Sequence, residues 1–179
     1  MDDQMWERWG AGAGVLAVVL LLVATFAAPQ APRIDAPTAK IVAWVTAHRR
    51  AILAENVIGL FSTGAFLWFV AHLRHVLQKA EGGAEVLAPV VFASGTAMGA
   101  VFAVGGAPYV ALAFLAAQPG GVAGPADAPV VRLLNDLSGI LYAPALILGV
   151  VFLGSWGLAM VRHELLSATL GWVAIAAAA

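Results

Sequence analysis

Polar side chains interrupt the apolar sequence at three places that are far apart along the chain. They are Glu55 and Asn56, then Tyr109, then Arg132, Asn135 and Asp136. A carboxylate in apolar surroundings attracts a cation, a proton or a small polar solute, because an isolated charge is costly there. If the fold brings the three places together, these residue types predict a polar ligand-binding pocket.

A structural role for the same residues is the alternative, and we favour it on the sequence alone. Arg132 and Asp136 are four residues apart and can pair on one helix. Asn135 and Glu55 can cap or link helices near the lipid headgroups, where water is available. The sequence leaves both interpretations open.

The histidines raise the question of a metal site. His72 and His75 lie about one helical turn apart, and His163 follows later in the chain. Three imidazoles at one membrane face can in principle hold zinc or copper. No HExxH motif is present, however, and His75 and His163 each adjoin an arginine. We therefore expect no metal and no other cofactor.

Composition excludes several classes of protein. The chain has no cysteine, which excludes disulfide frameworks and thiolate chemistry. Its net charge of −1 provides no basic surface for nucleic acid. Hydrophobic residues make up 62% of the chain and charged residues 11%, against about 25% charged residues in soluble domains. The polar residues above must therefore be positioned by elements that lie in a membrane.

Four stretches without a formal charge define those elements. They cover residues 9–32, 56–73, 86–126 and 137–161. About 20 helical residues cross a bilayer core, so each stretch is long enough for a span, or nearly so. We predict an all-α polytopic transmembrane helix bundle, a single integral membrane domain over residues 1–179. Its full spans cover about residues 10–28, 52–77, 86–117 and 130–160, with a partial fifth span over 167–179.

An amphipathic helix is predicted over residues 36–50, between the first two spans. Asp35 is a suitable N-cap, and Pro37 suits the first turn. Apolar residues then follow helical spacing, so we expect this helix to lie on the membrane surface. The third span is too long for one straight crossing, and Pro108 after two glycines predicts a break there.

Glycines on three spans predict close helix packing. They are Gly10 and Gly14, Gly59, and Gly95 and Gly99. Small residues on one stripe let a neighbouring helix approach closely in a membrane. We expect these stripes to carry association with a second copy or with another membrane subunit.

The orientation of the chain in the membrane is predicted from the distribution of its basic residues between the two faces. Arginine and lysine divide almost equally between the two faces, so the positive-inside rule decides nothing by count. Arg74 and Lys79 flank two spans tightly, on the same face as the N-terminus. We therefore place the N-terminus in the cytoplasm.

The plan of the chain resembles the small multi-pass membrane proteins of unknown function that abound in high-GC bacteria. The similar strings are WERWG at 6–10, AWVTAHRR at 43–50, FLWFVAHLR at 66–74 and APY at 107–109. The resemblance implies a bacterial inner membrane and brings no activity with it. Because those proteins have more spans, it also implies that this chain is a fragment that stops inside its fifth span.

The chain has several glycine stripes suited to helix packing and no recognisable catalytic motif, which favours a non-enzymatic protein. We expect a helper subunit or a small membrane binding module that contacts the lipid bilayer. The alternative is a transporter-like protein that binds a proton, a cation or a small polar solute near Glu55 and Asp136. A second alternative is an intramembrane metalloenzyme that uses His72, His75 and His163.

Overall fold

The computed structural model of the chain is all-α, as predicted. It describes residues 3–27, 29–82, 86–118, 120–122, 125–163, 165 and 168–178. Within these residues, four helical stretches are long and apolar enough to cross a membrane, and a shorter apolar helix follows near the C-terminus. By the length and hydropathy of its helices, the chain is a multi-pass membrane protein.

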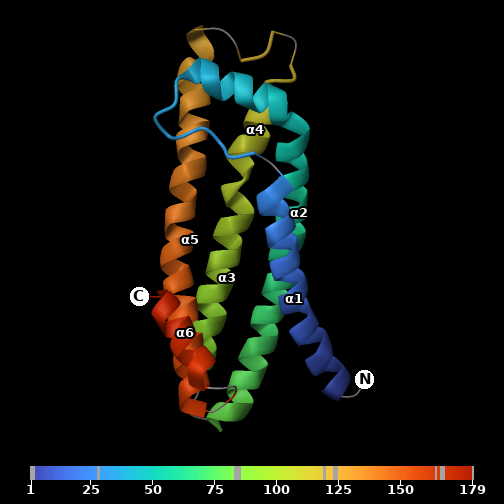
Figure 1. The fold of residues 1–179 in the computed structure, drawn as a ribbon, viewed down its shortest axis with the longest axis vertical. Helices are drawn as coiled ribbons and strands as arrows, with labels where there is room; N and C mark the ends of the chain where they lie inside the picture. Colours follow the sequence, from blue (N-terminus) through green and yellow to red (C-terminus); the bar gives the residue numbers. More distant parts are fainter. Residues whose placement is uncertain are drawn as a thin grey trace.

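The long helices run side by side along the long axis of the molecule (Figure 1). The elements are α1 (Asp3–Ala27), α2 (Thr38–Glu81), α3 (Leu87–Gly105), α4 (Ala107–Leu115), a short 3₁₀ turn (Pro125–Asp127), α5 (Ala128–His163) and α6 (Ala168–Ala178). We call the end of the bundle where α1 begins and α2 finishes the N-terminal end, and the opposite end the far end. Gly82 closes α2 in the left-handed conformation, with a φ of 60°, which glycine adopts without strain.

The predicted surface helix is the first part of α2, and it is continuous with the span that follows. Non-helical backbone at His48 (φ −112°, ψ 16°) marks a kink. Before this kink the helix crosses the far end of the bundle, and after it α2 turns along the bundle axis (Figure 1). We call residues 38–47 the crossing segment.

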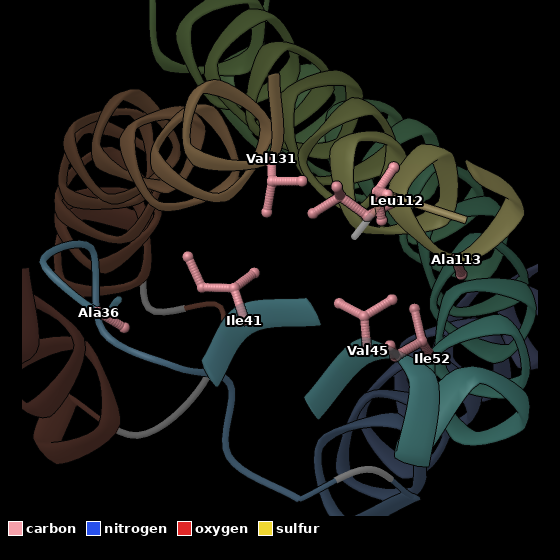
Figure 2. Close-up of a cluster of buried hydrophobic side chains, with 8 residues drawn as sticks. Ala36, Ile41, Val45, Ile52, Leu112, Ala113 and Val131 are labelled. Atoms are coloured by element: carbon pink, nitrogen blue, oxygen red, sulfur yellow. The ribbon is translucent and has the colours of Figure 1, made fainter. Parts of the chain in front are cut away.

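The crossing segment packs on protein, and this corrects the expectation that its apolar face rests on the membrane surface. Ile41 and Val45 are fully buried and point toward Leu112 of α4 and Val131 of α5 (Figure 2). The ends of α4 and α5 offer apolar side chains directly beneath it. Covering them removes apolar area on both sides from water, which stabilises the arrangement.

The predicted break in the third span occurs at Gly106, between α3 and α4. Pro108 stands in the first turn of α4, where its missing N–H costs no hydrogen bond. By contrast, α5 continues through Pro144 without interruption. The helix α6 packs along α5, and a Cβ on Gly157 would come within 2.8 Å of the Gly171 carbonyl oxygen. Such close approach of backbones is the packing that glycine permits in membranes.

Two hydrophobic clusters hold the bundle together, one at each end. The far cluster consists of Ala36, Ile41, Val45, Ile52, Leu112, Ala113, Val122 and Val131. The N-terminal cluster consists of Val70, Leu73, Leu77, Leu87, Ala88, Val91, Phe152 and Ala159.

Some predicted boundaries differ from the observed ones or fall outside the described residues. Helix α1 begins at Asp3, before the predicted start of the first span at Gly10. Ala28, Ser167 and Ala179, which end the predicted first and fifth spans, lie outside the described residues.

Candidate functional site

A cavity of about 620 Å³ lies between the two clusters, with walls from α1, α2, α3 and α5. Most of its wall is apolar, with Leu21, Phe66, Met98 and Phe152 among the lining side chains. Cavities of a few hundred cubic ångströms with apolar walls and a few polar groups are the usual form of small-molecule sites. The polar groups gather toward the far end.

Glu55 provides the formal charge of this wall. Among the described lining residues it is the charged one, and it is partly buried. It lies seven residues beyond the kink at His48, which is about 10 Å along the helix axis. Its carboxylate forms no hydrogen bond or ion pair with any described residue. Arg49 lies on the same helix, but its Nε donates to the carbonyl oxygen of Ala113 at 3.0 Å and not to Glu55.

Asn56 reaches the cavity because the chain is broken at Gly106. A Cβ on Gly106 would collide with the Asn56 amide nitrogen, so the side chain occupies space that only glycine leaves free. Both residues line the cavity. The break between α3 and α4 therefore makes room for a polar side chain of the facing helix.

Tyr109 connects the cavity wall to α5 and to the segment that joins α1 to α2. Its hydroxyl donates to Asn135 Oδ1 at 2.8 Å, and Asn135 Nδ2 lies 3.4 Å from the carbonyl oxygen of Arg33. Asn135 is only 2% exposed, and a buried amide is costly unless it is hydrogen-bonded. The network therefore fixes α4, α5 and the joining segment at one point.

Arg132 and Asp136 lie away from the cavity. Neither belongs to its wall, and Arg132 is exposed. The ion pair predicted between them is not formed. Among the described residues, the ion pair is between Lys79 and Glu7, with Nζ and Oε1 3.7 Å apart. Asp136 instead accepts from Asn135 Nδ2 at 3.2 Å. The predicted constellation thus divides: Glu55, Asn56 and Tyr109 line the cavity, Asn135 braces it, and the other two residues lie outside.

The crossing segment forms the roof of the cavity. Trp44 lines it and makes an edge contact with Tyr109, with ring centroids 5.6 Å apart. At the kink, His48 Nδ1 lies 2.9 Å from the Trp44 carbonyl oxygen. Arg49 satisfies a carbonyl in the last turn of α4, where the helix itself supplies no partner. The start of the α2 span, directly after the kink, is therefore tied to the end of α4.

The cavity is open on the side between α1 and α5. Among the described helices, α1 contacts α2 and no other, while residues of both α1 and α5 line the cavity. Residues 29–37 cross from the end of α1 toward α5 (Figure 1), and Pro29, Gln30 and Ala31 line the cavity. We call residues 29–37 the strap. Below the strap, no contact between the described residues of α1 and α5 closes this side.

Small residues seat α1 on α2. A Cβ on Gly10 would collide with the His72 ring, and one on Gly14 would come within 2.8 Å of Phe69. Ser62 Oγ donates to the Ala17 carbonyl oxygen at 2.8 Å. This face of α1 is therefore occupied by the chain's own second helix.

The other predicted packing glycines behave differently from one another. Gly95 and Gly99 are buried, with a Cβ at Gly95 coming within 2.9 Å of both Phe152 and Val70. They are covered by the chain's own α2 and α5, which corrects the expectation that they face another subunit. Gly59 has open space around it and lines the cavity, so no helix packs against it.

The three histidines do not form a metal centre in the described part of the chain, where no group of three or more His, Asp or Glu side chains is placed to hold an ion. His72 Nδ1 and His163 Nε2 are buried without a described hydrogen-bond partner. The arrangement therefore gives the metalloenzyme alternative no support.

Comparison with known proteins finds nothing similar. No protein-family model matches the chain, and no curated protein or solved structure is significantly similar to it. The resemblance to small multi-pass proteins of high-GC bacteria therefore stays a prediction.

Sequence reasoning missed several lining residues, above all Trp44, Ser138 and Tyr142. A signal for two of them was present, because Asn135, Ser138 and Tyr142 follow helical spacing on α5. Trp44 had no such signal, since its place depends on how the crossing segment folds over the bundle.

Proposed function

We propose that the protein is a non-enzymatic membrane binding module that holds a small amphipathic molecule taken up from the bilayer. The observation that carries this proposal is the cavity itself: about 620 Å³, apolar over most of its wall, polar at one end, and not closed by any contact between the described residues of α1 and α5. A ligand with an apolar body and a polar head matches that division. Entry between α1 and α5 requires no passage through water.

The hydroxyl groups on the wall support binding rather than catalysis. Ser62 donates to the Ala17 carbonyl oxygen, and Ser138 Oγ lies 3.4 Å from that of Gly105. A serine whose hydroxyl is bonded to backbone is held as a structural group and has no base to activate it. We therefore place the wall's role in recognition.

A transporter-like function has less support. That reading needs Glu55 and Asp136 in one pocket, and Asp136 does not line the cavity. Association with a second copy or another membrane subunit stays a prediction, and the same experiment tests it.

The test is native mass spectrometry of the protein extracted gently from its membrane, with two glycine variants. Gly59 and Gly64 lie on the same helix and both have open space where a Cβ would stand, but only Gly59 lines the cavity. Gly59→Leu fills the cavity, and Gly64→Leu is the matched control that adds the same side chain outside it.

We expect a small molecule on the wild-type chain and on Gly64→Leu, with occupancy reduced at least about tenfold in Gly59→Leu, because overlapping atoms cost more than binding provides. Equal occupancy in all three proteins would overturn the proposal. So would a stoichiometric companion protein with no small molecule, which would instead establish a helper subunit.

A further inference from the structure

The charge of the cavity wall is unbalanced. Glu55 is the formally charged residue among those described on the wall, and lysine, arginine and histidine are absent from that set. A carboxylate at bilayer depth is costly unless a cation or hydrogen-bond donors compensate it. The described side chains supply no cation to Glu55, since Arg49 is bonded to Ala113 and lies outside the cavity.

The hydroxyl donors around the cavity are largely committed to other groups. Tyr109 donates to Asn135, Ser62 to the Ala17 carbonyl oxygen and Thr25 to that of Leu21. Each of these oxygens keeps a lone pair and can still accept a hydrogen bond. The polar end therefore offers a charged acceptor and several neutral ones, which suits a head group that donates.

Aromatic rings surround the same end of the cavity. Trp44 and Tyr109 meet edge to face above it, and Tyr142 lines it from α5. Both tyrosines line the same cavity as Glu55. Aromatic faces attract cations and repel anions, so they add to the preference that the carboxylate sets.

We infer that the ligand is an amphiphile with a cationic ammonium head, which Glu55 and its aromatic neighbours hold while the apolar tail occupies the space between α1 and α3. This inference rests on the proposed function and adds the chemical class of the ligand. The apolar part of the wall, with Leu21, Phe102 and Met98, accommodates the tail. An anionic head group meets the repulsion of Glu55, and no cationic side chain of the described wall offsets it.

The test measures equilibrium binding of two tritiated probes that share a chain length and differ in charge: dodecylammonium and dodecanol. The full chain is placed in phosphatidylcholine nanodiscs, and empty nanodiscs supply the background from partition into lipid. We expect the wild type to bind dodecylammonium at least about tenfold more tightly than dodecanol, because a charge pair shielded from water adds to the free energy of binding.

Glu55→Gln keeps the shape and hydrogen-bonding capacity of the side chain and removes the charge. We expect this variant to bind both probes equally and to bind dodecanol as the wild type does, which also shows that it is folded. A preference for dodecylammonium that survives in Glu55→Gln would overturn the inference.

The Gly59→Leu variant separates failure of this inference from failure of the proposed function. If the wild type binds the two probes equally and Gly59→Leu binds neither, the cavity is a binding site and the assignment of a cationic head is wrong. If Gly59→Leu binds both probes as the wild type does, the cavity is not their site, and the inference and the proposed function both fail.

Discussion

The two halves of the bundle use the same kinds of residue for opposite purposes. In the N-terminal half, Gly95 of α3 leaves room for Phe152 of α5 and Val70 of α2 to pack against it, and buried apolar side chains fill the space. In the far half, no described atom lies where a Cβ on Gly59 would stand, and the missing side chain of Gly106 leaves space for the Asn56 amide. A glycine stripe in a membrane helix therefore predicts either a packed contact or a hollow.

Polar groups follow the same division. Glu55, Asn56 and Tyr109 lie where the bundle is hollow, while the N-terminal cluster consists of apolar residues. Tight packing leaves no room for a ligand, whereas a hollow gives polar side chains space in which to meet one. Stability and recognition are thus separated along the axis of one bundle.

The largest expected effect is at the packed half, with Gly95→Leu. The added side chain would meet Phe152 and Val70 on two sides, and overpacking of this kind costs about 3 kcal/mol. Thermal unfolding in detergent should show a clear loss of Tm, while Gly64→Leu, which meets open space, should not. An unchanged Tm for Gly95→Leu would mean that the packed half tolerates an added side chain as well as the hollow half does.

A smaller loss is expected where the far half is braced, with Asn135→Leu. The change leaves the Tyr109 hydroxyl and the Arg33 carbonyl without their partner, at a cost of about 2 kcal/mol. Arg132→Leu is the control, because Arg132 is exposed and makes no hydrogen bond or ion pair with a described residue. Equal losses of stability in the two variants would give Arg132 a structural role. They would contradict the finding that Asn135 braces the cavity while Arg132 lies outside it.

The smallest effect is expected next to the roof, just after the kink, with Arg49→Met. This change keeps the apolar stem and removes the hydrogen bond to the Ala113 carbonyl oxygen, at a cost of about 1 kcal/mol. Hydrogen exchange of the crossing segment should accelerate while that of α3 stays unchanged. The neighbouring exposed Arg50, changed to Met, should have no effect; matching acceleration in both variants would show that the bond does not hold the roof.

The long helices were predictable because the bilayer fixes their length and hydropathy. Alternation of the spans also places Glu55 and Tyr109 at the same end of the bundle, and both line the cavity. The rotation of each helix about its own axis was not predictable. Asp136 follows Asn135 by about 100° around α5, and this turn separates a bracing residue from one that lies outside.

The partner of each face was likewise beyond the sequence. The apolar side of the crossing segment suits lipid and helix ends equally well, and the fold chooses the ends of α4 and α5. Gly95 and Gly99 would suit a second subunit, yet α2 and α5 of the same chain cover them. Periodicity identifies which face is apolar or small, and it does not identify what packs against it.

The isolation of α1 has a consequence for how the chain assembles. Among the described residues, the far and N-terminal clusters contain no residue of α1, and both require residues of α5. Because membrane helices insert before they pack together, and synthesis proceeds from the N-terminus, the α1–α2 hairpin is in the bilayer before either cluster can close. Until α3 and α4 arrive, Glu55 has only its own hairpin, lipid and water around it. The cavity wall is therefore built in temporal order, from the first helix, which among the described residues packs on α2 alone, to the late helix that completes the core.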